Sequence, residues 1–230
     1  MSEMENKAGP KLEAASVAVL DRNEGRHNAA VEKRTYSYVK RLIDLLLSVI
    51  ALVILCVPLA IIMLMIYLDD PGPVFFSQYR VGRGGKKFKM YKFRSMKTDA
   101  PSDLSTAEIE NPNEYITRVG KIIRKYSIDE LPQLFNVLIG DMSLVGPRPL
   151  ILKEKDMHDM RNQYDVYSVR PGLTGLAQIN GRDLVTTEEK VSWDVKYLKE
   201  YGFFSDLKIF LLTIPKILSH ADVSEGSKKD

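Results

Sequence analysis

The feature that most constrains this chain is an uncharged apolar run over residues 45–68. As a helix rising roughly 1.5 Å per residue, the run is long enough to cross a hydrocarbon core about 30 Å thick. A buried helix of a soluble protein would need protein on every face, which a chain of 230 residues is too small to supply. The run therefore predicts a membrane element.

Basic residues on both sides of the run argue against a simple crossing helix, which carries its cations mainly on the cytoplasmic side. Pro58 stands near the middle, where it removes a backbone donor and clashes with the preceding turn at a cost of about 3 kcal/mol. We predict a re-entrant membrane helix over residues 33–70, broken at Pro58, with both ends cytoplasmic. A tilted, kinked crossing helix is the alternative. The flanking cations are Lys33, Arg34, Lys40 and Arg41 before the run, and Arg80, Arg83, Lys86, Lys87, Lys89, Lys92, Arg94 and Lys97 after it.

The remainder of the chain is interpreted as one domain between two polar tails. Residues 1–32 lack aromatic side chains and a sustained apolar period, so they are predicted to be a disordered tail. Residues 221–230 form a short polar tail at the other end. Residues 71–220, which begin at a turn signal of proline and glycine, are predicted to form the cytoplasmic domain that carries the chemistry.

The apolar patterns predict a mainly helical α+β fold. Two extended runs, residues 74–81 and 87–96, flank a glycine-rich turn and predict a β-hairpin. Residues 169–182 carry several glycines and are interpreted as a loop. The last helical pattern is amphipathic, so it either lies flat in the membrane interface or packs on the core. Helical patterns cover residues 115–125, 127–139, 153–166, 187–201 and 203–218.

The distribution of charge indicates the kind of partner. The formal net charge of +3 does not by itself indicate a nucleic-acid partner, and we expect none. The cations are concentrated, because residues 71–98 contain no acidic side chain. Such a segment beside a membrane element attracts anionic lipid headgroups by about 1 kcal/mol per cation. A single cysteine excludes a disulfide within the chain and a thiolate metal cluster.

Two cations of this segment are candidates for binding a phosphate. In an extended run Lys92 and Arg94 point to one side and Phe93 points to the other. The two cations would then converge on a phosphate while the ring packs in the core. Binding of lipid headgroups by the same cations is the alternative.

The adjacent carboxylates Asp129 and Glu130 are the strongest candidates for chemistry. They lie in a Ser-x-x-Glu pattern that begins at Ser127, which is typical of a capping box at a helix N-terminus. A helix N-terminus also keeps a carboxylate such as Asp129 ionised and helps to hold a phosphate nearby. A carboxylate so placed can attack phosphorus and form an acyl phosphate. The capping role and the nucleophilic role both stay open from these residues alone.

Three arginines near the pair are candidate phosphate ligands. Arg124 precedes the pair closely, and Arg148 stands between Pro147 and Pro149, where a stiff backbone holds the guanidinium in place. Arg170 is followed in the same way by proline and glycine. Each arginine is either a phosphate ligand or a partner in a structural ion pair.

Four motifs in order carry a resemblance to a known family. They are KFRSM at 92–96, SIDELPQLFNVL at 127–138, GDMSLVGPRP at 140–149 and RPGLTGLAQINGR at 170–182. Together they resemble the bacterial sugar transferases, which are monotopic phosphoglycosyl transferases that prime exopolysaccharide, capsule and glycoprotein glycan assembly. The likeness runs from about residue 40 to about residue 218 and matches the compact form of the family.

The resemblance implies transfer of hexose 1-phosphate from a UDP-sugar to undecaprenyl or another polyprenyl phosphate, with release of UMP. It places the reaction at the cytoplasmic face of the bacterial cell membrane, in contact with membrane lipids and with other glycan-assembly enzymes as possible partners. The route it implies is ping-pong, in two steps. Glucose or galactose is the favoured sugar, although N-acetylated hexoses are also used among relatives.

The resemblance also implies roles for individual residues. Asp129 matches the nucleophile that forms the phosphosugar intermediate, and Glu130 matches its partner in the catalytic pair. The family uses Mg²⁺, which we expect at these two carboxylates. The remaining positions are expected to bind substrate or to shape the membrane helix: Arg124 and Arg148 at phosphates, Lys92 and Arg94 at the entrance, Arg170, Gln178 and Arg182 at the nucleotide sugar, and Pro58 at the helix break.

One departure from the family pattern concerns the helix break. Many relatives carry serine before the proline, whereas Val57 stands there in this chain, so a shallower break is expected. Two other functions are compatible with these residues. A membrane-tethered protein that binds anionic lipid without catalysis would use Asp129 and Glu130 only as caps. A phosphohydrolase would pass the same aspartyl intermediate to water.

Overall fold

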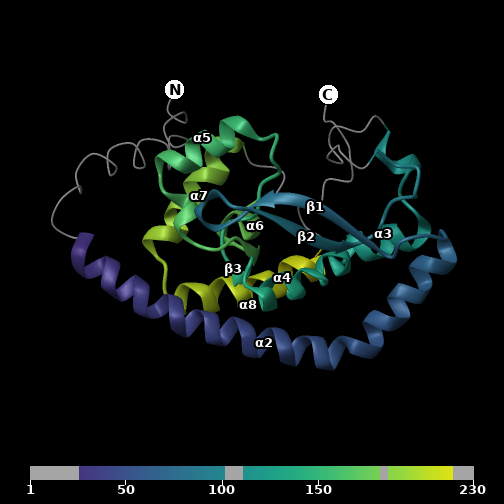
Figure 1. The fold of residues 1–230 in the computed structure, drawn as a ribbon, viewed down its shortest axis with the longest axis horizontal. Helices are drawn as coiled ribbons and strands as arrows, with labels where there is room; N and C mark the ends of the chain where they lie inside the picture. The colour runs from purple at the N-terminus through teal and green to yellow at the C-terminus, as the bar shows by residue number, and fades with distance from the viewer. Residues whose placement is uncertain (1–25, 102–110, 182–185, 220–230) are drawn as a thin grey trace, which may run out of the picture. The chain divides into compact units, whose positions relative to one another are not determined.

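The computed structural model describes residues 26–101, 111–181 and 186–219. The chain divides into two units, residues 1–40 and 41–230. The first helix spans the boundary between them, and the other elements belong to the second unit. The elements appear in Figure 1. Arg182 and the tails over residues 1–25 and 220–230 lie outside the described residues.

The apolar run lies in one long helix, α2 (Arg26–Asp69). The helix begins earlier than the expected residue 33, so the last part of the predicted tail is helical. It also passes through Pro58 without interruption, whereas the sequence predicted two helices separated by a break. The fixed φ of proline is compatible with a helix and only one hydrogen bond is lost, so the chain bends instead. Figure 1 shows α2 as a single curved helix.

Both ends of the apolar run attach to the same globular unit. Near its start, Asp44 Oδ1 accepts a hydrogen bond from the Leu144 amide at 3.1 Å. At its end, Asp69 Oδ2 accepts from the Val119 amide at 2.8 Å. By length and composition the helix is apolar enough to cross a membrane. Its outer side exposes a band of large apolar side chains: Leu42, Leu46, Leu47, Val49, Ile50, Val53, Ile54, Val57, Ile61, Leu64, Met65, Tyr67 and Leu68.

The predicted hairpin is confirmed as β1 (Phe75–Val81) paired antiparallel with β2 (Lys87–Phe93). Gly84 has a φ of 66° in the connecting turn, a backbone conformation that glycine adopts without strain. Phe88 and Met90 on β2 are buried in the main core. Lys87 and Lys89 alternate with these two residues and point outward, whereas Lys92 lies on the same side of the strand as Phe88 and Met90.

A second sheet was missed by the sequence analysis. β3 (Ser143–Val145) pairs in parallel with β4 (Gly172–Thr174), inside the segment interpreted as a loop, and α6 (Leu176–Ile179) follows. The strands approach so closely that a Cβ on Gly172 would lie 2.1 Å from the Gly146 amide nitrogen. Strands this short give no alternating pattern, and glycines like those that allow the close approach are also typical of loops.

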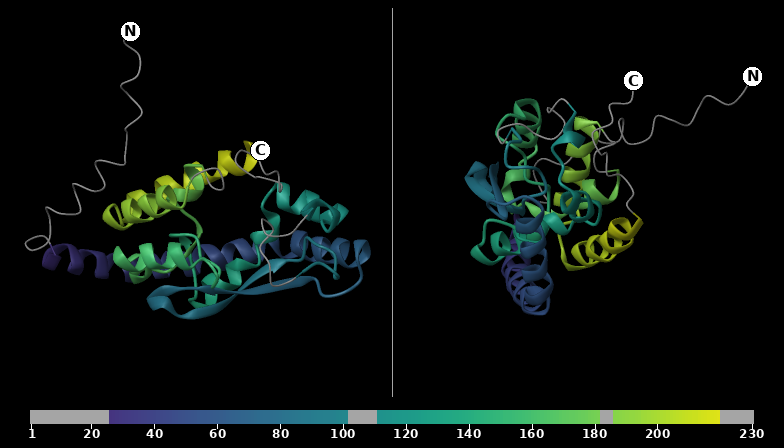
Figure 2. Two further views of the ribbon diagram at one scale, coloured as in Figure 1. Left: turned by 90° about the horizontal axis from the view of Figure 1, so that it is seen from above. Right: turned by 90° about the vertical axis from the view of Figure 1, so that its right-hand side faces the viewer.

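The remaining helices contribute to several apolar clusters. α3 (Arg118–Lys125), the 3₁₀ turn η3 (Ile128–Glu130) and α4 (Gln133–Ile139) follow one another, and Gly140 ends α4 with a φ of 96°, as predicted. α5 (Lys155–Gln163), α7 (Thr187–Lys199) and α8 (Phe203–Ser219) complete the unit. Shorter 3₁₀ turns lie at η1 (Arg83–Gly85), η2 (Pro112–Glu114) and η4 (Val166–Ser168). In both views of Figure 2, α8 lies on the opposite side of this unit from the hairpin.

Candidate active site

The acidic pair lies in the 3₁₀ turn η3 and not at the start of an α-helix. Ser127 has a φ of 55°, its side chain makes no capping hydrogen bond, and α4 begins only at Gln133. The predicted capping box is therefore wrong. Glu130 binds two cations from other elements, and these contacts replace the one to the Ser127 amide. The helix-terminus argument for the charge of Asp129 consequently does not apply.

Two cations converge on the pair. Lys92 Nζ lies 2.7 Å from Glu130 Oε1 and 3.9 Å from Asp129 Oδ2. Arg148 Nη2 lies 3.3 Å from the same Glu130 oxygen. The side chains of Asp129 and Glu130 are 13% and 9% exposed, whereas that of Arg148 is 36% exposed. The acidic pair is thus partly sheltered, and Arg148 is the most exposed side chain among these contacts.

The hairpin positions Lys92 as the sequence predicted, since Phe93 is buried on the opposite side of β2. Arg94 lies beyond the end of the strand and turns toward the end of α2. Its Nη2 is 3.4 Å from Asp70 Oδ2 and also donates to the Asp70 carbonyl. Lys92 and Arg94 therefore have different carboxylate partners, because the alternation of side chains stops where β2 stops.

Arg80 adds a further cation beside Arg148, and no sequence pattern distinguishes it from the other cations of its segment. Its Nη1 donates to the Pro149 carbonyl at 3.3 Å. Burial lowers the pKa of Arg80 to about 10, and the charge of Arg148 lowers it as well. Neighbouring guanidiniums repel each other in a poorly solvated site, so this arrangement favours an anionic ligand.

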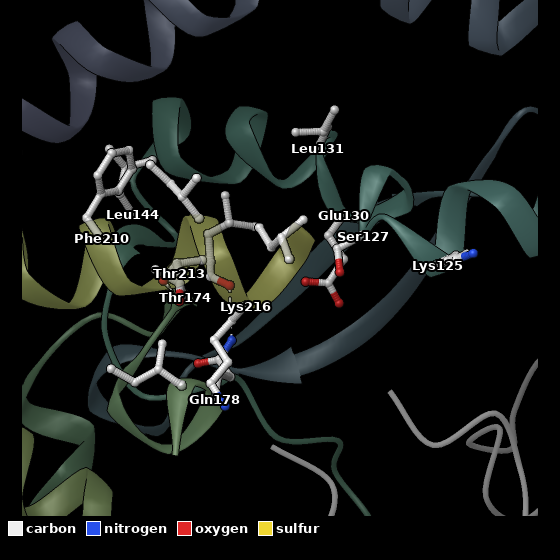
Figure 3. Close-up of a pocket in the computed structure, with 14 residues that line it drawn as sticks. Lys125, Ser127, Glu130, Leu131, Leu144, Thr174, Gln178, Phe210, Thr213 and Lys216 are labelled. Carbon is white, nitrogen blue, oxygen red and sulfur yellow. Dashed lines mark hydrogen bonds between the residues drawn. The ribbon is translucent and has the colours of Figure 1, made fainter. Parts of the chain in front are cut away.

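A cavity of about 250 Å³ opens beside Glu130. Figure 3 shows Glu130 and Ser127 on one side and Phe210 with Leu144 on the other. The apolar wall consists of Leu131, Leu144, Leu173, Ile179 and, from α8, Phe210, Ile214 and Ile217. The polar lining consists of Lys125, Ser127, Glu130, Thr174, Gln178, Thr213 and Lys216. The contribution of α8 was not predicted, because its pattern indicates an apolar face but not what that face contacts.

The other predicted ligands occupy several places. Gln178 lines the cavity, and its Nε2 donates to the Leu173 carbonyl at 3.0 Å. Arg124 lies in the last turn of α3, where its carbonyl accepts from the Ser127 amide at 3.0 Å and supports the turn before the acidic pair. Arg170 instead binds the end of α4, through Nε to the Gly140 carbonyl at 2.9 Å. Burial lowers the pKa of Arg170, and the charge of Arg41 contributes.

The acidic pair has the donor chemistry for Mg²⁺. Magnesium prefers oxygen ligands and is usually held by one or two carboxylates together with substrate phosphates. Asp129 and Glu130 supply two such carboxylates side by side. Within the described ranges, no group of three or more His, Cys, Asp or Glu side chains gathers into a metal site. The residues therefore fit an ion shared with a phosphate ligand better than a closed protein cage.

Comparison with known proteins assigns this geometry to a family. The model of the bacterial sugar transferase family matches residues 35–220. The chain belongs to the bacterial sugar transferase family. The match covers α2 from residue 35 onward, the hairpin, the acidic pair and α8, so every element of the candidate site lies within it.

Relatives of two lengths match this sugar transferase. The uncharacterized sugar transferase EpsL of Bacillus subtilis is 44% identical over 189 residues, which cover 81% of this chain and 89% of the relative. The galactosyl transferase CpsE of Streptococcus agalactiae is 42% identical over 81% of this chain and 43% of its own length. The undecaprenyl-phosphate glucose phosphotransferase of Komagataeibacter xylinus is 44% identical over 77% of this chain and 35% of its own length. The chain thus spans most of a compact relative and less than half of the longer ones.

Proposed function

We propose that this sugar transferase moves hexose 1-phosphate from a UDP-sugar to polyprenyl phosphate and releases UMP. The observation that carries the proposal is the carboxylate pair Asp129 and Glu130, which lies between two cations and beside an apolar cavity. Cations suit the phosphates of both substrates, and an apolar wall suits an isoprenoid chain. A related protein of Xanthomonas campestris, named UDP-glucose:undecaprenyl-phosphate glucose-1-phosphate transferase, is 37% identical over 211 residues.

In the first step a carboxylate oxygen of Asp129 attacks the phosphorus that carries the sugar. The bond between that phosphorus and the bridging oxygen of the diphosphate breaks, and UMP leaves with the bridging oxygen. The product is an acyl phosphate that joins Asp129 to the sugar phosphate. Lys92 and Arg148 are placed to stabilise the negative charge that moves onto the departing phosphate.

In the second step a phosphate oxygen of the polyprenyl phosphate attacks the same phosphorus. The bond to Asp129 breaks, the carboxylate is regenerated, and the product is a polyprenyl diphosphate sugar. The cavity wall from α8, with Phe210, Ile214 and Ile217, is suited to the first isoprene units of the acceptor. Shelter of the acidic pair limits attack by water, which distinguishes a transferase from a phosphohydrolase.

Asp129 and Glu130 would hold Mg²⁺ together with the diphosphate of the donor. When bound, the ion would neutralise charge on the diphosphate as UMP departs. Glu130 also keeps Lys92 and Arg148 beside Asp129, through contacts of 2.7 and 3.3 Å to its Oε1.

The membrane arrangement that fits this reaction is monotopic, with α2 entering and leaving on the cytoplasmic face and α8 in the interface. The attachment of Asp44 and Asp69 to one globular unit supports it, because a crossing helix would place these positions on opposite sides of the membrane. Cysteines introduced singly before Leu42 and after Asp70, in a Cys56→Ala background, test it. Labelling from one side is expected, and labelling from opposite sides would exclude this topology.

The biological setting follows from the named relatives. We place the reaction in the priming step of exopolysaccharide or capsule assembly at the bacterial cell membrane, with other glycan-assembly enzymes as partners. Glucose or galactose is the favoured sugar, in keeping with the names of the Komagataeibacter and Streptococcus relatives. A relative from Aeromonas hydrophila is named as an N-acetylgalactosaminephosphotransferase, so the sugar has to be measured.

Product analysis tests the function. The solubilised protein is incubated with Mg²⁺, polyprenyl phosphate and a panel of UDP-sugars, and both UMP and lipid-linked sugar are quantified. UMP in equal amount to a lipid diphosphate sugar is the expected result and names the sugar. UMP with free sugar phosphate, independent of lipid, would identify a phosphohydrolase. Failure of every UDP-sugar to yield UMP would support a lipid-binding protein without catalysis.

A further inference from the structure

A closed ion pair lies behind the candidate site, between α5 and α7. Arg161 donates through Nε and Nη2 to Asp194 Oδ2, at 2.9 and 2.6 Å. The two side chains are 3% and 2% exposed. Removing two charges from water costs several kcal/mol for each ion, so a buried pair is weak evidence for stability on its own. The pair therefore calls for a role other than holding two helices together.

The third nitrogen of Arg161 links this pair to the site. Nη1 donates to the backbone carbonyl of Arg148 at 2.8 Å. A guanidinium is a rigid planar fork, so two bonds to Asp194 fix the direction in which Nη1 points. The carbonyl that it holds belongs to the residue whose side chain contacts Glu130 at 3.3 Å. An unbroken series of polar contacts thus runs from α7 to the acidic pair.

The segment that carries Arg148 is also held from its other side. Arg80 Nη1 donates to the Pro149 carbonyl at 3.3 Å, and the Val81 amide donates to the Leu150 carbonyl at 3.0 Å. Prolines on both sides of Arg148 restrict its backbone further. With the backbone fixed by Arg161, the remaining freedom of Arg148 lies in its side chain, which is 36% exposed.

We propose that Arg161 and Asp194 are positioning residues that fix the backbone of Arg148 and thereby aim its guanidinium at a phosphate of the nucleotide-sugar donor. The inference rests on the proposed function, in which Arg148 contacts the donor. Neither Arg161 nor Asp194 touches the substrate. A displacement of about 1 Å in a positioning group can reduce turnover by up to about 10²-fold, so even a conservative change at Arg161 is felt in the reaction.

A double-mutant cycle tests the proposal with four proteins: the parent, Arg161→Lys, Arg148→Ala and the double variant. Steady-state kcat and KM for the UDP-sugar are measured, together with Tm. Arg161→Lys is expected to lower kcat/KM by about tenfold in the parent and to have no further effect once Arg148 is alanine. An equal loss in both backgrounds would mean that Arg161 does not act through Arg148, and the proposal would be overturned.

Two further variants serve as a substitute and as a control for this experiment. Asp194→Asn keeps the shape and one acceptor oxygen, so it replaces Arg161→Lys in the cycle if the lysine variant does not fold, with the same expected and contrary results. Glu200→Gln removes an exposed pair on the same helix, where Lys196 Nζ lies 3.9 Å from Glu200 Oε1 and both side chains are 52% exposed. We expect it to leave kcat/KM unchanged.

UDP affinity of the same proteins separates this proposal from the proposed function. Arg161→Lys is expected to weaken UDP binding severalfold only when Arg148 is present. That coupling in a protein that transfers no sugar would preserve the positioning role and refute the transferase reaction. UDP binding that is absent, or weakened equally in both backgrounds, would overturn the positioning role whether or not sugar is transferred.

Discussion

Two ionic groups of this protein are built from similar residues and differ in their surroundings. In the open group, Glu130 shares one oxygen between Lys92 and Arg148, at 2.7 and 3.3 Å, beside a cavity. In the closed group, Arg161 and Asp194 form two hydrogen bonds with almost no exposed surface. The open group has contacts that a ligand can replace, whereas the closed group is complete within the protein.

This difference in surroundings suggests that the open group takes part in the reaction and that the closed group positions it. An incoming phosphate can take over the contacts that Lys92 and Arg148 now make with Glu130, because these side chains are 18% and 36% exposed. No ligand can reach Arg161 or Asp194 without separating α5 from α7. A change in the open group should therefore reduce the reaction and spare the fold, and a change in the closed group should reduce stability as well.

The largest effect is expected from Asp129→Asn. The asparagine keeps the size of the side chain and one acceptor oxygen but cannot form the acyl phosphate, so kcat should fall by about 10³-fold or more. Its Tm should stay close to that of the parent, because the ion pair with Lys92 spans 3.9 Å. Turnover and thermal unfolding in detergent measure the two quantities. A large fall in Tm would place Asp129 with the structural residues.

The corresponding change in the closed group is Arg161→Met, which leaves the buried Asp194 without its cation. Breaking one partner of a buried pair costs about 3–5 kcal/mol in the free energy of unfolding. Burial already raises the pKa of Asp194 and Arg161 opposes that shift, so the variant raises it further. Because the folded-state pKa then exceeds the unfolded value, the stability deficit should shrink as the pH falls from 7.

Thermal unfolding of parent and Arg161→Met at pH 7 and pH 5.5 measures this linkage. A deficit of the same size at both pH values would show that Asp194 does not carry an uncompensated charge in the variant. That result would contradict the description of Arg161 and Asp194 as a pair of opposite charges.

A smaller effect is expected from Lys92→Met. Loss of a charged hydrogen bond to Glu130 and of its contact with the donor phosphate should lower kcat/KM by about 10- to 100-fold. Lys87→Met is the matched control, since Lys87 is an exposed lysine of the same strand that lies away from the acidic pair. Equal losses in both variants would indicate that the charge of the strand, and not the position of Lys92, supports the reaction.

The smallest effect is expected at the cavity wall. Ile214→Asn places a polar side chain where the isoprenoid chain is proposed to lie, and should raise KM for polyprenyl phosphate by about three- to tenfold. KM for the UDP-sugar should not change. Initial rates at varied lipid and fixed donor distinguish the two. A rise confined to the UDP-sugar would assign the apolar wall to the nucleotide.

Sequence patterns predicted the parts of the fold that depend on interactions between residues close together in the chain. The hairpin, the burial of Phe93 opposite Lys92, and Gly140 at the end of α4 all follow from alternation or backbone preference. The capping box failed because Glu130 binds cations that come from distant parts of the chain. A pattern of four consecutive residues carries no information on contacts with distant parts of the chain.

Pairings between segments far apart in the chain could not be predicted from sequence patterns. β3 and β4 are three residues each and separated by two helical segments, so no periodicity identifies them. Arg161 and Asp194 lie on different helices, and nothing in either helix distinguishes this pair from the exposed pair at Lys196 and Glu200. Candidate site residues were found from their chemical types, whereas the residues that position them became visible only with the fold.

The most direct test of the central claim is to trap the intermediate. The protein is incubated with its UDP-sugar and Mg²⁺ in the absence of polyprenyl phosphate, quenched rapidly in acid, and digested for peptide mass spectrometry. We predict one hexose phosphate on the peptide that contains Asp129, with one UMP released per adduct, and no adduct in Asp129→Asn. An adduct on another residue, or UMP release that requires the lipid and leaves no adduct, would contradict the two-step mechanism.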